Sequence, residues 1–526
     1  MSSLRTLGLL LAALLLWQVS AEEEEGRNVI FRKKIEALYG PHHKVDKRAA
    51  TSTTSVVASS SFSSSSYVPS FPASKTFTTP DYSISKSYSR SPSPTPADCG
   101  KEDCKFYNSK TEPYFIKEFP DVDFDTGEFY GGSTPIDEDD PSRTLFWIFK
   151  PAENISVDEV TIWLNGGPGC SSLEGFLQET GPISYTAGQY RPSHNPFHWA
   201  QLTNMLWVEQ PVGTGFSQGK VKAKNEFDVA DEFNAFFKNW QKTFGIKNYK
   251  IYITGESYAG FYIPYIGGGM LDMKDKEYYD LRGALMYDPC IGDCGWVQNT
   301  MPTTQFAVNN QLILNLNQSI LDDMVAKSAT CGIDHFIDKY LQFPPPGHQP
   351  TERSISNSHR DCYDVIDDYY TGVTNKNPCY DVYHITAWCP TLPDPKQTYF
   401  NRPDVKKAIH APMNQHWSEC SFKSVFAGNG YDVSPLSIEA KLPQVIEATN
   451  RVLVANGDWD GLVFTNGTLL AIQNMTWGGK LGFQEKPSKD FEVPLALDST
   501  GFLYHYGRQG VMGIAHEERG LMWTET

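Results

Sequence analysis

A serine that could act as a nucleophile lies in the stretch YITGESYAGFYIP, residues 252–264. Ser257 follows an apolar, β-prone run and precedes a helical pattern, with Gly255 and Ala259 two residues away on either side. A nucleophile elbow needs this context, because the strand-to-helix turn is so tight that only small residues fit at those two positions. A serine that caps a helix fits the short motif equally well. The motif alone therefore leaves both interpretations open.

A second stretch, WLNGGPGCSS (163–172), could supply hydrogen-bond donors for a developing negative charge. It also follows a predicted strand, and its glycines expose successive backbone N–H groups that can hold an anion or an oxyanion. A glycine-rich turn without a chemical role is the alternative interpretation. The presence of both stretches, in this order, favours a nucleophilic role for Ser257.

Together the two stretches closely resemble the serine carboxypeptidase family of α/β-hydrolases, over most of residues 100–526. EQPVGTGFS (209–217) and NGDWDGL (456–462) are similar to further segments of that family. The ending GVMGIAHEERGLMW is most similar to its fungal secreted branch. The resemblance implies an α/β-hydrolase fold, in which helices flank a mostly parallel central sheet and a cap is inserted.

The resemblance also implies a role for each matching residue. Ser257 corresponds to the nucleophile and Asp460 to the acid of a catalytic triad, whereas Asp458 would bond to the loop backbone. The oxyanion hole would consist of the backbone N–H groups of Gly167 and Tyr258. The site for the C-terminal carboxylate of a peptide would involve Trp163, Asn165, Gly166, Glu179 and Glu256.

Glu179 and Glu256 would form a pair whose chemistry suits a carboxylate-binding site. Two carboxyl groups held together do not both ionise readily, so one of them stays protonated to a higher pH. A protonated carboxyl donates a hydrogen bond to a substrate carboxylate, whereas an ionised one repels it. Specificity for free C-termini and an acidic pH optimum would then have the same cause.

The proton acceptor for Ser257 is the part of the pattern that the sequence lacks. In the family, the catalytic histidine lies near the C-terminus in a Gly-His-x-x-Pro-like segment, and no such segment occurs here. His516 follows Asp460 at a suitable distance but lacks the flanking Gly and Pro, so we do not expect it to be the base. GLMWTET resembles the strand that leads to the catalytic loop. The domain is therefore expected to be C-terminally truncated, before that histidine.

Apolar runs in the sequence predict the strands and the helix that would position these residues. Five runs are predicted to be buried strands, and they alternate with helical patterns as in a parallel sheet. These runs are 159–165, 204–211, 250–255, 282–287 and 451–458. A helix is predicted at 225–244, because Phe227, Ala230, Phe233, Phe237, Trp240 and Phe244 recur at helical spacing.

The chain is expected to divide into three regions. Residues 1–21 have the charged, apolar and small-residue segments of a signal peptide. Residues 22–98 are predicted to be a pro-segment and a disordered Ser/Thr-rich linker, and Lys47-Arg48 is either a processing site or an ordinary basic pair. Residues 99–526 would form the hydrolase domain, with the cap at about 290–445.

Composition restricts the partners and the compartment. The net charge of -17 argues against binding to nucleic acid. The ten cysteines agree with an oxidising compartment, so we expect a secreted protein or, alternatively, one in a vacuolar lumen. No stable membrane insertion, no metal site and no cofactor is expected. By resemblance, Cys170 would pair with Cys420. The possible glycan acceptors are Asn154, Asn317, Asn466 and Asn474.

Three functions fit these observations. The first is a serine carboxypeptidase that releases C-terminal amino acids from peptides and proteins through an acyl-enzyme at acidic pH. The second is a secreted protein of the same fold that binds peptide C-termini without catalysis, because the histidine is absent. The third is acyl transfer to a small alcohol by the same nucleophile.

Overall fold

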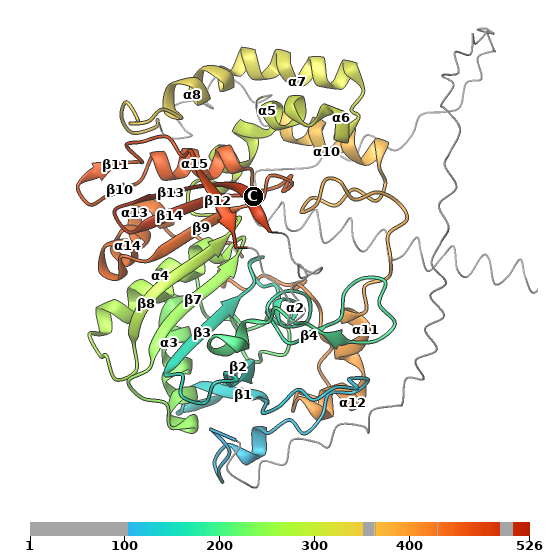
Figure 1. The fold of residues 1–526 in the computed structure, drawn as a ribbon, viewed down its shortest axis with the longest axis vertical. Helices are drawn as coiled ribbons and strands as arrows, with labels where there is room; N and C mark the ends of the chain where they lie inside the picture. Colours follow the sequence, from blue (N-terminus) through green and yellow to red (C-terminus); the bar gives the residue numbers. More distant parts are fainter. Residues whose placement is uncertain (1–103, 351–361, 363, 429, 495–508) are drawn as a thin grey trace, which may run out of the picture.

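The computed structural model describes residues 104–350, 362, 364–428, 430–494 and 509–526. The predicted signal peptide, pro-segment and linker, at 1–98, lie outside these residues. A ten-stranded sheet extends through the structure in the order β1-β2-β6-β3-β7-β8-β9-β14-β13-β12 (Figure 1). The strands from β6 to β14 in this order pair in parallel, and the outer strands pair antiparallel. The predicted fold class is therefore confirmed.

The strands of the large sheet are β1 (Tyr130–Asp137), β2 (Asp140–Lys150), β3 (Glu159–Leu164), β6 (Asn204–Glu209), β7 (Lys250–Glu256), β8 (Asp280–Tyr287), β9 (Val452–Asn456), β12 (Lys489–Val493), β13 (Gly510–Glu518) and β14 (Leu521–Glu525). Two short hairpins consist of β4 (Ile183–Ser184) with β5 (Ser193–His194) and of β10 (Thr476–Trp477) with β11 (Lys480–Leu481). The helices are η1 (Glu112–Tyr114), α2 (Leu173–Gln178), η2 (Trp199–Gln201), α3 (Glu226–Phe244), α4 (Ala259–Met273), η3 (Cys294–Thr300), α5 (Met301–Asn309), α6 (Gln311–Leu314), α7 (Gln318–Cys331), α8 (Ile333–Tyr340), α10 (Asp364–Lys376), α11 (Lys396–Asn401), α12 (Pro403–Ala408), α13 (Ser437–Ala440), α14 (Leu442–Thr449) and α15 (Thr465–Gln473).

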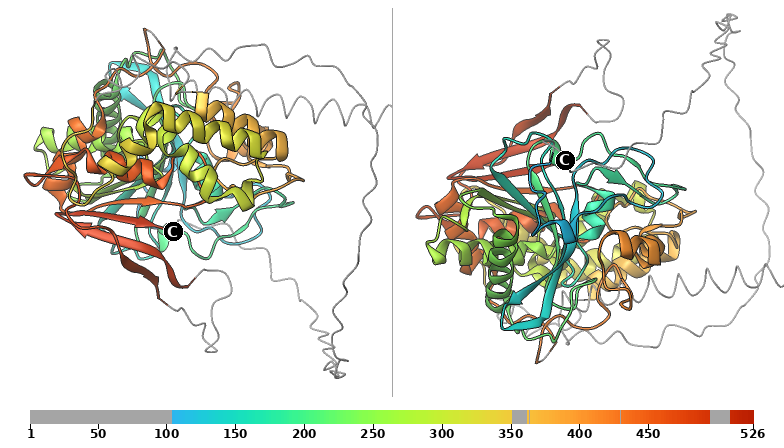
Figure 2. Two further views of the ribbon diagram at one scale, coloured as in Figure 1. Left: turned by 90° about the horizontal axis from the view of Figure 1, so that it is seen from above. Right: turned by 90° about the horizontal axis from the view of Figure 1, so that it is seen from below.

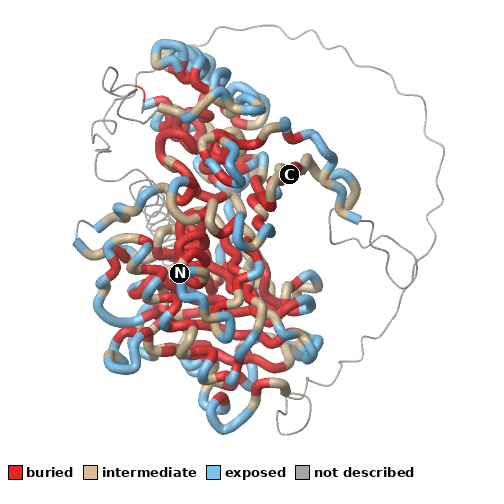
Figure 3. Tube along the Cα trace, turned by 90° about the vertical axis from the view of Figure 1, so that its left-hand side faces the viewer, coloured by how far each residue is buried: buried red, intermediate tan, exposed pale blue. Residues whose placement is uncertain are grey.

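Both faces of the sheet are buried, which explains the continuous apolar runs of its central strands. Successive side chains point to opposite faces, so in β2 Trp147 and Phe149 join one core cluster and Phe146 and Ile148 join the other. Helices α3, α4 and α14 pack on the first face, and α2 packs on the second. Figure 3 shows the buried segments running through the centre of the molecule.

The predicted helix at 225–244 is present as α3, but one residue of its predicted apolar stripe is misplaced. Phe227 is 44% exposed; it lies in the first turn of the helix and packs against the Tyr265 ring with centroids 4.9 Å apart. The other stripe residues are buried as predicted. Asn225 caps the helix by accepting a hydrogen bond from the Asp228 N–H at 3.0 Å.

The interval 290–445 does not form a single layer. Helices α5, α7, α8 and α10 pack together above the carboxyl ends of the strands (Figures 1 and 2). The part that includes α11 and α12 instead packs on the second face of the sheet, where Tyr399, Phe400 and Trp417 are buried. Within the described residues, none of the helices is long and apolar enough to cross a bilayer.

Candidate active site

Ser257 lies at the tight turn between β7 and α4, in a backbone conformation that few residues other than glycine adopt. Its φ angle is 56°. Gly255 permits the turn, because a Cβ atom there would lie 2.1 Å from the Leu164 carbonyl oxygen of the neighbouring strand. The Ser257 N–H donates to the Tyr287 carbonyl oxygen at 2.9 Å and its own carbonyl accepts from the Cys290 N–H at 2.9 Å. The serine is thereby presented at the carboxyl ends of the strands, as in a nucleophile elbow.

The glycine-rich loop after β3 lies directly against this elbow. A Cβ atom on Gly166 would lie 2.5 Å from the Tyr258 nitrogen and 2.8 Å from the Ser257 Cβ. Gly167 has a φ angle of 113°, which a larger residue would rarely adopt. The two residues predicted to donate to an oxyanion, Gly167 and Tyr258, are thus brought to neighbouring positions by β3 and β7, which pair in parallel.

A disulfide and two backbone hydrogen bonds hold the glycine-rich loop on its other side. Cys170 is joined to Cys420, with their Cα atoms 3.9 Å apart. The Ser171 N–H donates to the Glu419 carbonyl at 2.7 Å, and the Ser421 N–H donates to the Gly169 carbonyl at 2.9 Å. The segment around residue 420 therefore fixes the loop that would supply oxyanion donors.

A chain of hydrogen bonds runs from the buried end of β3 to the two glutamates. The Trp163 indole N–H donates to Asn165 Oδ1 at 2.8 Å, and the Gly175 N–H donates to the same oxygen at 3.3 Å. Asn165 Nδ2 is therefore turned toward the carboxyls and donates to Glu256 Oε1 at 2.8 Å and to Glu179 Oε1 at 3.4 Å. Because Asn165 and Trp163 are each only 1% exposed, they support the glutamates from behind and do not line the pocket.

The Glu179 carboxyl is in an environment that favours its protonated form. The residue is exposed on the pocket side, and its carboxyl lies close enough to protein atoms to lose hydration. This loss of solvation, followed by repulsion from Glu256, raises the pKa of Glu179 well above its usual range. The structure therefore places side by side the two carboxyls whose pairing the sequence predicted.

Asp460 is buried at the start of the segment that leads to α15. Its Oδ1 accepts hydrogen bonds from the N–H groups of Leu462 at 2.6 Å and Val463 at 2.9 Å. Burial and, next, the charge of Asp288 raise the pKa of Asp460. Asp458 is exposed, and its Oδ1 accepts a 3.4 Å hydrogen bond from the Thr465 hydroxyl. Of the two aspartates, only Asp460 lines the pocket.

Asp288 is a pocket residue that the sequence reasoning missed. It follows β8, and its Oδ1 accepts from the Gly457 N–H at 2.8 Å and from Asn456 Nδ2 at 3.3 Å. It thereby holds the loop that carries Asp460. Burial raises the pKa of Asp288 to about 7. Its position directly after a predicted buried strand was the available signal, because carboxyl ends of parallel strands meet at one edge of a sheet.

These residues surround one cavity of about 360 Å³. It is lined by Gly166, Gly167, Cys170, Glu174, Gln178, Glu179, Thr186, Glu256, Ser257, Asp288, Tyr383, Asp460, Leu462 and Val463. No histidine is among these described residues. His516 lies on β13, where its Nε2 is 2.9 Å from Glu518 Oε1 and its ring meets the edge of Phe483. His516 is therefore a structural residue of the sheet.

Glu209 explains the EQPVGTGFS stretch as a support for the glycine-rich loop. Its completely buried carboxyl accepts hydrogen bonds from the Ser171 hydroxyl, from Trp417 Nε1 at 2.9 Å and from the Phe216 N–H at 2.5 Å. Gly215 leaves room for that carboxyl, because a Cβ atom there would overlap it. Burial raises the pKa of Glu209 to about 7.

The remaining predicted sites are distributed over the surface and the cap. Of the possible glycan acceptors, Asn154 and Asn317 are exposed, and Asn466 and Asn474 are half-buried. Three further disulfides lie within the cap interval: Cys290–Cys294, Cys331–Cys362 and Cys379–Cys389. Among the described residues, no group of three metal-ligating side chains converges.

The parallel sheet, the strained serine and the facing glycine-rich loop define a serine hydrolase of the α/β-hydrolase class. The family model described as serine carboxypeptidase matches residues 120–520. The chain belongs to the serine carboxypeptidase family.

Individual relatives agree with this assignment. Serine-type carboxypeptidase F of Aspergillus niger is 49% identical, with 81% of this chain and 84% of that protein aligned. A carboxypeptidase Y homolog of Arthroderma benhamiae is 41% identical, with 80% and 83% aligned. The crystal structure of the prohormone-processing carboxypeptidase Kex1(delta)p from Saccharomyces cerevisiae superposes with a TM-score of 0.61 at 24% identity, over 79% of this chain and 91% of that chain. The structural match shows a shared fold.

We expect the paired glutamates to make binding of a free peptide C-terminus weaken as pH rises. The raised pKa of Glu179 keeps its hydrogen available at acidic pH, and that hydrogen is lost on the alkaline side of the raised pKa. In a Ser257→Ala background, calorimetry should show affinity falling about tenfold or more between pH 5 and pH 8. With Glu179→Gln the fall should be less than about threefold, because an amide donates at every pH. An unchanged pH dependence in Glu179→Gln would contradict this role.

The raised pKa of Asp288 predicts a pH effect on folding. Its folded pKa of about 7 exceeds the ordinary value of 3.8, so the free energy of unfolding falls as pH rises between these values. Asp288→Asn keeps the Oδ1 acceptor and lacks the charge. In urea titrations the free energy of unfolding of the variant should match that of the wild type at pH 4 and exceed it by roughly 1–3 kcal/mol at pH 8. This difference is smaller than the full pKa shift implies, because pocket water screens the carboxyl. A less stable variant at pH 8 would show that the carboxylate form is the favoured one.

Proposed function

We propose that this chain removes C-terminal residues from peptides and proteins by nucleophilic attack of Ser257 on the last peptide bond. The observation that carries the proposal is the shared cavity, in which Glu256 directly precedes the nucleophile and pairs with Glu179. A site that holds a backbone carboxylate beside the nucleophile selects the last peptide bond, because only the C-terminal residue of a peptide has a free backbone carboxylate. Membership of the serine carboxypeptidase family supports the same reaction.

The proposal assigns a role to each of the matching side chains and backbone N–H groups. Ser257 forms the acyl-enzyme, and the N–H groups of Gly167 and Tyr258 stabilise the tetrahedral oxyanion. Glu179 and Glu256, with the Gly166 N–H, hold the terminal carboxylate. Asn165 and Trp163 orient Glu256.

Asp460 is proposed as the acid that orients the base in a serine triad. Its Oδ1 accepts two backbone hydrogen bonds, which fixes the direction of its carboxyl group. Asp288 holds the loop of Asp460 in place. The proposal assigns the base to no described residue of the pocket.

The compartment and the domain boundaries are also proposed. Disulfides within the described part agree with a secreted protein or, alternatively, with one in a vacuolar lumen. We propose residues 1–21 as a signal peptide, 22–98 as a pro-segment and linker, and 99–526 as the hydrolase domain. Peptide C-termini are the proposed substrates.

A peptide and its C-terminal amide distinguish the proposed exopeptidase from other activities. At acidic pH we expect turnover of the free acid to exceed that of the amide at least about tenfold, since the amide lacks the group that the glutamates hold. Chromatography of released amino acids measures the difference, and Ser257→Ala is the matched control for release by Ser257. Equal turnover of both peptides would contradict the exopeptidase assignment. Selective binding of the free acid without any release would favour the non-catalytic binding protein, and transfer of the acyl group to an added alcohol would favour the acyltransferase.

A further inference from the structure

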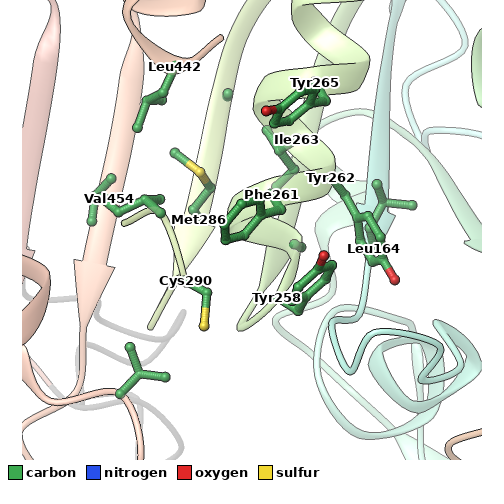
Figure 4. Close-up of a cluster of buried hydrophobic side chains, with 14 of the residues drawn as sticks. Leu164, Tyr258, Phe261, Tyr262, Ile263, Tyr265, Met286, Cys290, Leu442 and Val454 are labelled. Atoms are coloured by element: carbon green, nitrogen blue, oxygen red, sulfur yellow. The ribbon is translucent and has the colours of Figure 1, made fainter. Parts of the chain in front are cut away.

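The hydroxyl of Tyr258 lies between two carboxyl groups beneath the nucleophile elbow. Tyr258 Oη is 2.8 Å from Asp432 Oδ2 and 3.2 Å from Glu226 Oε1. The ring is buried, stacks on Phe261 with centroids 5.2 Å apart, and meets Tyr262 edge-on at 5.1 Å (Figure 4). The backbone N–H of this same residue is one of the two proposed oxyanion donors.

Counting hydrogens limits the hydrogen bonds that these three groups can form together. A phenol carries one hydrogen, so Tyr258 donates to one carboxyl only. Asp432 is the nearer acceptor, and its other oxygen accepts from the N–H of Ser434 at 3.0 Å and from the hydroxyl of Ser434 at 2.6 Å. An ionised Glu226 would then face the phenol oxygen with no hydrogen between them. A protonated Glu226 removes this conflict by donating to Tyr258 Oη.

The surroundings of Glu226 also favour the neutral acid. Its side chain is completely buried, and Oε2 has no hydrogen-bond partner among the described residues. A buried carboxylate without full compensation is strongly disfavoured. Burial, followed by the charge of Asp432, raises the pKa of Glu226. The other titratable groups that face it are the phenols of Tyr258, Tyr262 and Tyr265.

We propose that Glu226 is a positioning residue for the oxyanion hole, a neutral acid that donates to Tyr258 Oη, which in turn donates to Asp432. The chain of hydrogen bonds joins the first residue of α3, the elbow and the segment at 432–434. A second contact ties the same segments, because the Glu226 N–H donates to the Ser434 hydroxyl at 2.7 Å. This inference rests on the acyl-enzyme reaction proposed above.

The neighbouring tyrosine extends the effect to the other half of the oxyanion hole. Tyr262 Oη accepts a hydrogen bond from the Gly169 N–H at 3.1 Å. Its ring packs against Tyr258, so the elbow and the glycine-rich loop are held through one pair of rings. A shift of the Tyr258 ring would therefore disturb both oxyanion donors.

Four variants and a matched control test the proposal. Glu226→Leu keeps the volume and removes the donor, Tyr258→Phe removes the hydroxyl, and Glu226→Gln retains a donor. We expect kcat for peptide release to fall about tenfold in Glu226→Leu and in Tyr258→Phe, with KM changed less than about twofold, since only the oxyanion donors move. The double variant should fall no further, because both substitutions break one chain. Glu226→Gln should stay within about threefold of the wild type.

Tyr265→Phe is the control, because it also removes a buried phenol hydroxyl that faces Glu226, but one that donates to the Pro435 carbonyl at 2.6 Å. It should leave kcat unchanged.

The kcat of the wild type should also fall at alkaline pH as Glu226 ionises, whereas Glu226→Gln should retain its kcat to higher pH. Wild-type kcat in Glu226→Leu, or additive losses in the double variant, would overturn the positioning role.

An infrared difference spectrum separates this inference from the proposed function. At neutral pH the wild-type-minus-Glu226→Gln difference spectrum should contain the carbonyl stretch of one buried carboxylic acid, because the other buried carboxyls contribute to both spectra and cancel. If that band is present but the wild type releases no amino acid, the proposed function is contradicted, whereas the protonation of Glu226 is supported. Absence of the band overturns the inference whatever the activity.

Discussion

The candidate site depends on one close approach, that of the Gly166 backbone to the elbow at Ser257 and Tyr258. β3 and β7 pair in parallel with Leu164 opposite Gly255, so the loops that follow them leave the sheet at the same edge. Neither Gly166 nor Gly255 has room for a Cβ atom. Because both side chains are absent, the two loops touch, and donors from one loop can face a nucleophile on the other. The disulfide at Cys170 and the buried Glu209 keep the loop in that position.

A second feature is the number of carboxyl groups that lie in or near the pocket and lose hydration there: Glu209, Glu226 and Asp460 are buried, Asp288 is half-buried and Glu179 is open to the pocket. Burial is the largest cause of the raised pKa at Glu179, Glu209, Glu226, Asp288 and Asp460. In each of these groups burial shifts the titration toward the protonated form, relative to an exposed carboxyl. Folding and recognition of a carboxylate are thus favoured by the same acidic conditions, since protons that stabilise the interior also supply the donor at Glu179.

The sequence predicted the parts of the fold that local patterns determine. β3, β6, β7, β8 and β9 are continuous apolar runs because both faces of the sheet are buried, and the glycines at 166 and 255 mark backbone contacts that only glycine allows. The antiparallel strands β1, β2, β12 and β13 were not predicted. β12 and β13 are mostly exposed or half-buried, so they lack a continuous apolar run. β2 is buried from Leu145 to Lys150, and its apolar run was overlooked.

What the sequence could not show are contacts between distant segments. Asp288 and Tyr383 reach the pocket from separate loops, and Glu226 meets Asp432 at Tyr258 although about two hundred residues separate the two acids. Phe227 fits the helical period but lies where nothing covers it fully. The direction of the Asn165 amide was also not predictable: its nitrogen donates to Glu256, because Trp163 and Gly175 donate to its oxygen.

The most direct measurement is a crystal structure of the Ser257→Ala chain with a bound peptide at acidic pH. We expect the terminal carboxylate within hydrogen-bond distance of Glu256, Glu179 and the Gly166 N–H, and the last peptide carbonyl beside residue 257, facing the N–H groups of Gly167 and Tyr258. A peptide bound with its C-terminus outside this cavity, or with an internal bond at residue 257, would contradict the account.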